Sequence, residues 1–276
     1  MRLAAPVPAP QGDPDLWVRA VQAKGYRAAY LPVDAAADRP EEFARAAAEA
    51  DLVIAEVGAW SNPLAADSED RAKARRLCAE RLALADRAGA RCCVNIAGSR
   101  GTKWDGPDSR DLTAETFDLI VDTVREIIDA VRPTRTFYTL ETMPWMYPDS
   151  PESYLELMRA IDRPRFAVHF DPVNLVSSPQ RYFRSGDLIR DFCAKLGPHI
   201  RSCHAKDILL QPKLTTHLDE VRPGLGGLDY RTLLGELSRL DADLPVCLEH
   251  LPSEAEYDAA ATHVRGIAAE IGIRLL

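Results

Sequence analysis

The sequence lacks the features of membrane, secreted and nucleic-acid-binding proteins. No apolar stretch approaches the roughly 18 residues of a membrane-spanning helix. The apolar N-terminal stretch 1–7 is too short for a secretory signal, and the charged segment 13–15 interrupts it. Positive charge is not in excess: 34 Lys and Arg residues stand against 42 Asp and Glu residues. Phosphate backbones bind basic surfaces, so we expect a cytoplasmic protein with neither a nucleic-acid nor a membrane partner.

Paired cysteines and a glycine-rich phosphate loop are also missing. The six cysteines include no Cys-x-x-Cys pair, so a structural zinc site has no suitable spacing. Several lie in apolar runs, where a free thiol packs as a small hydrophobic group, and we expect no disulfides. The turn after the first apolar run, 2–7, has no glycine-rich loop. A doubly wound nucleotide-binding sheet is therefore the second choice of fold.

The chain does contain a regular alternation of strand-like and helix-like segments. Short apolar runs begin near residues 2, 28, 52, 92, 136, 166, 200 and 245, and a helix-like segment follows each of them. In one of these, 117–131, apolar residues recur at helical spacing and form one face. Apolar runs without polar alternation are typical of parallel strands covered by helices. Eight such units predict an α/β fold, a single (β/α)8 TIM barrel over residues 1–276.

Four polar residues end the last four apolar runs at matching points. They are Glu141, Asp171, His204 and Glu249. The carboxyl ends of barrel strands meet on one face, so these side chains should converge. Three carboxylates brought together without a cation would repel one another. The mixed oxygen and nitrogen set suits one divalent ion, and we expect Mn²⁺ ahead of Mg²⁺, Co²⁺ or Zn²⁺.

The segments around these residues resemble the xylose isomerase-like TIM-barrel superfamily, in particular its sugar phosphate isomerase/epimerase branch. The resemblance covers nearly the whole chain and is carried by Leu-Glu-Thr-Met-Pro-Trp at 140–145, Phe-Asp-Pro-Val-Asn at 170–174, Cys-His-Ala-Lys-Asp at 203–207, the stretch 222–229 and Leu-Glu-His at 248–250. It implies that the quartet Glu141, Asp171, His204 and Glu249 binds the metal. It also implies a small carbohydrate-like substrate and a homo-oligomer.

The resemblance further implies proton transfer beside a carbonyl group. The metal would act as a Lewis acid, while Glu141 and Glu249 would remove and return a proton through an enediolate. Return of the proton gives epimerisation or isomerisation of a sugar, sugar phosphate or related polyol-ketone. Loss of a β-hydroxyl from the same enediolate gives dehydration. The alternative function is therefore a dehydratase or lyase acting on a keto-sugar, keto-inositol or dehydroshikimate-type substrate.

Other residues are candidates for substrate binding. Asn174 stands where ketohexose epimerases of this branch usually carry a histidine, so a standard free-ketohexose epimerase is not favoured. Glu56 ends the third apolar run and is expected to face the mouth of the site. Trp60 and Trp104 fall in loops on the same face, where an aromatic ring can pack on a sugar. These residue types, taken singly, are as often structural as functional.

Two long loops are expected on the same face, after the fourth and seventh strands, at about 99–111 and 208–228. Lys206, just past His204, is expected beside the metal ligands or the substrate. Arg222, in the second loop, would suit a hydroxyl, carboxylate or phosphate.

Two further functions fit less well. The apurinic endonuclease branch of the superfamily needs more metal ligands and a basic face, whereas the net charge here is −8. A non-catalytic barrel would have no reason to keep mutually repelling carboxylates.

Overall fold

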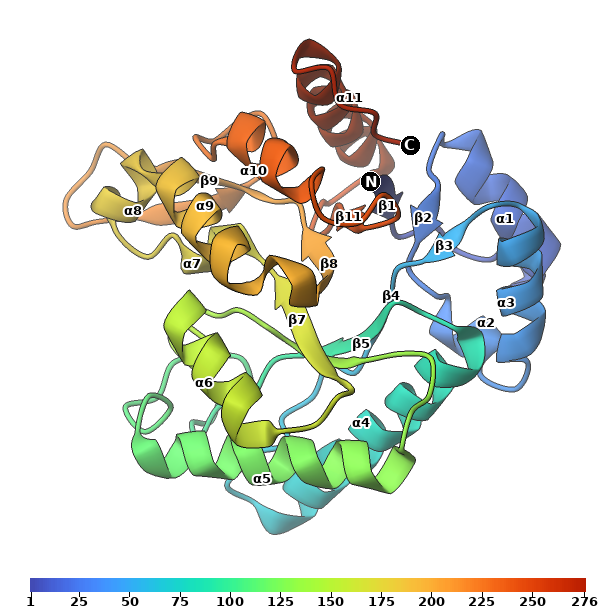
Figure 1. The fold of residues 1–276 in the computed structure, drawn as a ribbon. Coiled ribbons are helices and arrows are strands. Elements are labelled where there is room, and N and C mark those ends of the chain that lie inside the picture. The colour runs from blue at the N-terminus through green and yellow to red at the C-terminus, as the bar shows by residue number, and fades with distance from the viewer.

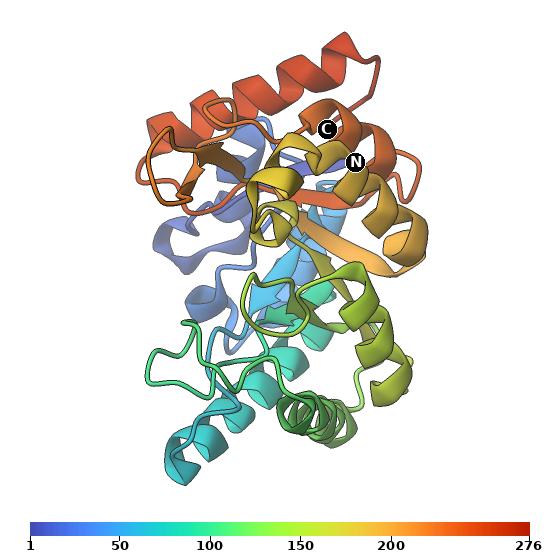
Figure 2. The same cartoon turned by 90° about the vertical axis from the view of Figure 1, so that its left-hand side faces the viewer.

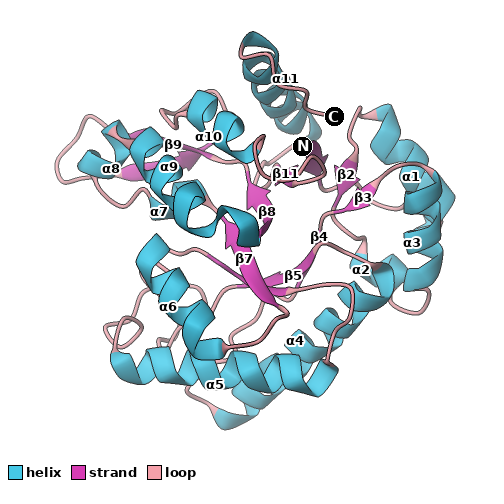
Figure 3. Ribbon diagram, viewed as in Figure 1, coloured by secondary structure: helices cyan, strands magenta, loops and turns pink.

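Parallel strands form the inner wall of the protein, and helices surround them (Figure 1, Figure 3). The computed structural model describes residues 1–276. The main sheet has the order β3-β2-β1-β11-β8-β7-β6-β5-β4. Its strands are β1 (Arg2–Ala5), β2 (Ala28–Ala29), β3 (Val53–Ile54), β4 (Glu56–Gly58), β5 (Cys92–Asn95), β6 (Tyr138–Glu141), β7 (Phe166–Phe170), β8 (Ile200–His204) and β11 (Pro245–Cys247). The predicted TIM barrel is confirmed.

The barrel closes at a bend in what the sequence suggested to be a single strand. The ends of the sheet, β3 and β4, are separated in the chain by Ala55 alone. β3 pairs with β2, and β4 pairs with β5. The carbonyl of Ile54 also accepts a hydrogen bond from Arg91 N–H at 3.0 Å, across to the β5 side. β3 and β4 therefore act as one bent strand of the barrel, which hydrogen-bonds to β2 on one side and to β5 on the other.

Helices form the outer layer of the protein (Figure 2). The longer helices are α1 (Pro14–Ala23), α3 (Pro40–Glu49), α4 (Ser68–Ala88), α5 (Ala114–Val131), α6 (Pro151–Ile161), α9 (Ser185–Leu196), α10 (Tyr230–Leu237) and α11 (Glu254–Glu270); the short ones are α2 (Val33–Ala36), α7 (Pro172–Leu175) and α8 (Pro179–Phe183). In α5, the Thr113 side chain caps the helix by accepting from Thr116 N–H. No helix is long and apolar enough to span a membrane.

One buried aspartate organises each of the two long loops. Asp111 accepts hydrogen bonds from Ser99 Oγ at 2.8 Å and from the backbone of Arg100 at 2.7 Å. The second loop contains an antiparallel hairpin of β9 (Asp207–Leu210) and β10 (Leu218–Val221). Asp207 holds the turn that follows β10, because its side chain accepts hydrogen bonds from the backbone N–H groups of residues 224, 226 and 228. The loops are thus ordered structures.

The opposite end of the barrel, where the strands begin, is held by paired charges. Arg2, only 7% exposed, lies 2.8 Å from Asp51 Oδ1 and 2.8 Å from Asp243 Oδ1. Arg91 pairs with Asp241. The chain termini also lie side by side at this part of the molecule, where Leu276 N–H donates to the carbonyl of residue 1. All six cysteines are buried and free, as their apolar surroundings predicted.

Candidate metal centre

The four predicted metal ligands converge at the carboxyl ends of their strands. Glu141 ends β6, Asp171 directly follows β7, His204 ends β8 and Glu249 follows β11. One ligand atom from each lies within 4.8 Å of the other three. His204 Nδ1 is 2.7 Å from Glu249 Oε1, 3.2 Å from Glu141 Oε1 and 3.6 Å from Asp171 Oδ2. Such separations suit donor atoms around one ion with bonds of about 2.1 Å.

Two carboxylate oxygens in this cluster are buried without a hydrogen-bond partner. They are Asp171 Oδ2 and Glu249 Oε1. The other oxygen of Asp171 caps α7, because it accepts from the N–H groups of Val173 and Asn174 at 2.9 and 3.1 Å. The orientation of Asp171 is thereby fixed, and its Oδ2 makes no hydrogen bond but lies 2.7 Å from Lys206 Nζ. Buried carboxylates are costly without balancing positive charge, and the single ammonium group of Lys206 does not balance three of them, so the donor set fits a divalent metal.

The cluster shifts the pKa values of its members in opposite directions. Burial works to lower the pKa of His204, but the carboxylates of Glu249, Glu56 and Glu141 outweigh it and raise that pKa well above its usual value. Burial raises the pKa of Glu141. The pKa of Glu249 falls to about 2, because His204 and Lys206 together outweigh burial. The site therefore has a strong demand for positive charge.

Glu56 lies behind the cluster, and the prediction that it faces the mouth is wrong. Its side chain is 1% exposed. Oε1 lies 3.2 Å from His204 Nε2, while Oε2 accepts from Ser202 Oγ at 2.9 Å and lies 3.0 Å from His169 Nε2. The bend at Ala55 turns Glu56 into the barrel, which the sequence pattern does not show. With Nε2 bonded to Glu56, His204 presents Nδ1 to the other ligands. His169 is fully buried in the core.

A cleft of about 620 Å³ is lined by Glu141 and Glu249, two of the four candidate metal ligands, while Asp171 and His204 are fully buried. Trp60, Trp104, Asn174 and Lys206, all predicted to bind substrate, line it. The rings of Trp60 and Trp104 are partly exposed, and the centre of the Trp60 ring lies 6.5 Å from that of His204. Both long loops contribute to the lining, as predicted. Trp145, exposed to 37%, adds a third indole to the wall.

Asn174 and Lys206 make direct contacts with the cluster. Asn174 Nδ2 donates to Glu141 Oε1 at 3.0 Å and so positions that glutamate. Lys206 is 2% exposed, and its Nζ lies 2.7 Å from Asp171 Oδ2 and 3.0 Å from Glu249 Oε1. Burial works to lower the pKa of Lys206, but the surrounding carboxylates raise it well above its usual value. The ammonium group therefore stays charged beside the site.

The hairpin in the second long loop places one residue in the cleft that we did not predict and directs another away. Glu220, on β10, lines the cleft and lies 3.3 Å from Lys206 Nζ. Its only sequence signal was its place in a long loop. Arg222, predicted to bind substrate, does not line the cleft. Its Nε lies 2.8 Å from Glu256 Oε2, so it joins the turn after β10 to the start of α11.

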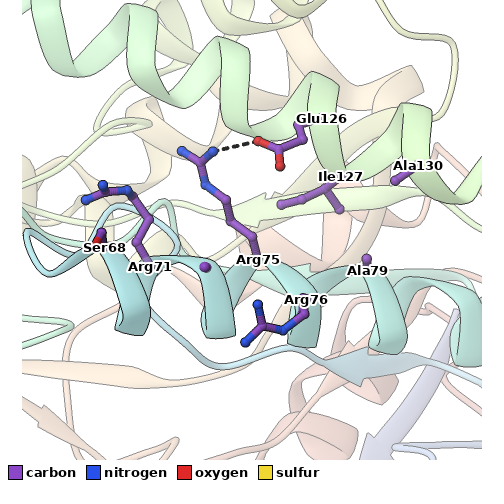
Figure 4. Close-up of a pocket in the computed structure, with 9 residues that line it drawn as sticks. Ser68, Arg71, Arg75, Arg76, Ala79, Glu126, Ile127 and Ala130 are labelled. Atoms are coloured by element: carbon purple, nitrogen blue, oxygen red, sulfur yellow. Dashed lines mark hydrogen bonds and ion pairs between the residues drawn. The ribbon is translucent and has the colours of Figure 1, made fainter.

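A separate arginine-lined cavity of about 340 Å³ lies between α4 and α5 (Figure 4). Arg75 lies 2.6 Å from Glu126 Oε2 and donates to Thr123 Oγ1 at 2.9 Å. Arg71 donates to the backbone carbonyls of residues 65 and 66. These two guanidinium groups are satisfied within the protein and tie α4 to its surroundings, so we assign the cavity no ligand.

Comparisons with known proteins agree with the fold. A search of curated proteins found no significant match. The probable 3-DHS dehydratase AsbF of Bacillus anthracis is 17% identical, with a TM-score of 0.70 over 97% of this chain and 99% of that one. D-psicose 3-epimerase of Clostridium cellulolyticum H10, solved with D-tagatose, is 13% identical with a TM-score of 0.70 over 99% and 100%. A xylose isomerase-like TIM barrel protein from Mycobacterium smegmatis in complex with magnesium is 18% identical with a TM-score of 0.66 over 98% and 97%.

At these low identities, the structural neighbours show the fold and leave the reaction open. The family comparison extends further. The model for the xylose isomerase-like TIM barrel matches residues 18–267, which includes every strand from β2 to β11. The chain belongs to the xylose isomerase-like TIM barrel family.

Proposed function

We propose that the protein is a divalent-metal-dependent isomerase or epimerase of a carbohydrate or related polyol-ketone. The observation that carries the proposal is the convergence of Glu141, Asp171, His204 and Glu249, with two buried oxygens lacking hydrogen-bond partners. The fold neighbours include two enzymes described as D-psicose 3-epimerases and one L-ribulose 3-epimerase, which supports this reaction class. We favour Mn²⁺ from the donor set, and the magnesium complex of a fold neighbour supports a hard divalent ion.

The two glutamates are the proposed acid and base. When bound, the ion would draw charge toward a substrate carbonyl and so make the adjacent C–H more acidic. Glu141 and Glu249 come from β6 and β11, which stand at opposite ends of the run β11-β8-β7-β6 in the sheet. One would remove the proton and the other would return it. Asn174 holds Glu141 in place by its 3.0 Å hydrogen bond.

The cleft supplies groups suited to a sugar. Trp60, Trp104 and Trp145 can pack on the apolar face of a pyranose ring. Lys206 and Glu220 offer a charged donor and a charged acceptor for hydroxyl groups. Polar groups converge at the base of the cleft and aromatic rings form its walls, a common arrangement in sites for small polar ligands.

Lys206 supports a second candidate, a dehydratase. Elimination of water needs a base for the C–H and an acid for the departing hydroxyl. Lys206 is a charged, buried donor 3.0 Å from Glu249 Oε1 and could supply that acid. One fold neighbour is described as a probable 3-DHS dehydratase, which supports this candidate.

Metal analysis and solvent exchange test the proposal. Elemental mass spectrometry of the purified protein should find about one divalent ion per chain. The protein, reconstituted in turn with Mn²⁺, Co²⁺, Mg²⁺ and Zn²⁺, would then be incubated with a panel of keto-sugars in D₂O. Deuterium incorporation beside the carbonyl, without water loss, would support the isomerase or epimerase. An absorbing enone would favour the dehydratase, and no metal after reconstitution would refute both.

A further inference from the structure

A second cleft adjoins the first and shares part of its wall. It measures about 460 Å³ and lies between the segment after β1, helix α1 and the start of α11. Pro6 and Tyr257 line both clefts. The two clefts therefore meet at Pro6 and Tyr257.

The wall of the second cleft is mainly apolar and has little conformational freedom. Three prolines and Val7 form one side, and Leu251 and Pro252 form the other. Proline fixes its own backbone φ angle, so this surface loses little entropy when a ligand binds. Tyr26 is 2% exposed, and Arg265 lies over its ring. The surface is preformed for an apolar group.

Several polar groups of the second cleft already have partners within the protein. Lys24 forms ion pairs with Glu254 and, at 3.5 Å, with Asp258. Ser253 caps α11 by accepting from Glu256 N–H. A second sugar ring would need free donors and acceptors here, whereas an alkyl or aryl group needs none. The chemistry of the wall thus selects an apolar occupant.

We propose that the substrate is a keto-pyranoside with an apolar aglycone, whose sugar ring lies in the first cleft and whose aglycone lies in the second. This inference rests on the proposed function for the identity of the sugar-binding cleft. Pro6 and Tyr257 mark the junction where the glycosidic bond would pass.

Binding measurements test the inference without requiring turnover. Metal-loaded protein would be titrated calorimetrically with matched methyl and n-hexyl keto-pyranosides derived from glucose, galactose and mannose. The hexyl glycoside of at least one sugar should bind about tenfold or more tightly than its methyl partner, since the longer chain buries more apolar area. Equal affinities, or no binding of any glycoside, would overturn the inference. Deuterium exchange into free keto-sugars would still test the proposed function by itself.

Variants of the second cleft locate the effect. Ala20→Trp, on the α1 side of the cleft, should reduce the hexyl-to-methyl affinity ratio to about one and leave methyl glycoside binding unchanged. Arg19→Trp, on the same helix but outside the cleft, is the matched control and should keep the full ratio. Leu251→Ala, a milder change, should reduce the ratio severalfold. An unchanged ratio in Ala20→Trp would refute the inference, as would a dimer in light scattering that Ala20→Trp dissociates, because a second copy would then fill the cleft.

Discussion

The two ends of the barrel carry charge in opposite arrangements. Where the strands begin, Arg2 lies between Asp51 and Asp243, and Arg91 pairs with Asp241. Where the strands end, carboxylates from separate strands gather around one point, with His204 and Lys206 among them. Charges at the first end satisfy each other and hold the barrel together. Charges at the second end are in excess, which suits a site that binds a cation.

Ion pairs that only stabilise the fold also differ from the charged groups that are candidates for metal binding or catalysis. The Arg2 side chain is slightly more buried than that of Glu249, at 8% against 11% exposed, yet both of its carboxylate partners are exposed and within 2.8 Å. Glu249 Oε1, in contrast, is buried without a hydrogen bond, and its charged neighbours, His204 and Lys206, belong to the candidate metal centre itself. Burial alone therefore does not identify the site. The informative feature is a buried charged atom whose protein partners are incomplete.

The largest effect should come from the two glutamates. Glu141→Gln and Glu249→Gln should each lower kcat by roughly 10²–10⁴-fold, because an amide cannot take or give the proton. Circular dichroism should show an unchanged fold. Asp243→Asn, at the other end of the barrel, is the control and should keep its kcat. Activity retained in either glutamine variant would rule out the two-glutamate mechanism.

Metal removal should lower the Tm, and this effect should depend only on residues at the end of the barrel where the strands end. A metal present at about 100 times its Kd stabilises the fold by roughly 2.7 kcal/mol, and a chelator should abolish that gain, seen as a lower Tm. In Asp171→Asn, the Tm should no longer respond to chelator or added Mn²⁺. Asp243→Asn should keep the full metal response. A chelator-sensitive Tm in Asp171→Asn would count against Asp171 as a ligand.

Glu56→Gln should weaken metal binding by roughly 10–100-fold, because Glu56 orients His204 without being placed in the cleft. Competition with a fluorescent chelator would measure the affinity. Ser202→Ala removes one hydrogen bond to Glu56 but leaves its contact with His204, so its effect should be smaller. Equal affinities in the wild type and Glu56→Gln would show that the contact with His204 has no positioning role.

The smallest effect is expected where the strands begin, and it concerns stability alone. Asp86 accepts from the backbone N–H groups of residues 134, 135 and 136 at 2.9, 2.6 and 3.0 Å. Burial opposes these bonds, but together they lower the pKa of Asp86. Asp86→Ala should lower the free energy of unfolding by about 1–3 kcal/mol at pH 7, with no change in kcat.

The pH dependence of Asp86 follows from the direction of its shift. A carboxyl group with a lowered pKa in the folded state stabilises the protein fully above its unfolded pKa of 3.8 and loses that contribution as the pH falls through the folded pKa. Urea unfolding should therefore show the gap between the wild type and Asp86→Ala narrowing below about pH 4. A gap that widened in acid would contradict this assignment.

Sequence reasoning succeeded where a residue's position along a strand decides its location. Glu141, Asp171, His204 and Glu249 each follow an apolar run, and parallel strands bring such ends together. The orientation of Glu56 could not be predicted, because it depends on the bend at Ala55, between β3 and β4.

The hairpin of the second long loop was equally inaccessible from the sequence. It depends on long-range bonds to Asp207, which span up to 21 residues. Because of that hairpin, Glu220 lines the cleft, whereas Arg222, two residues further on, points away from it and pairs with Glu256.

The buried thiols have a practical consequence. All six cysteines are buried, and burial raises the pKa of those in the strands, such as Cys92 and Cys247. An alkylating reagent should thus modify the folded chain only during transient opening. Because these sulfurs lie on β5, β8, β11, α4 and α9, the rate of modification at each would report how often that segment of the wall opens.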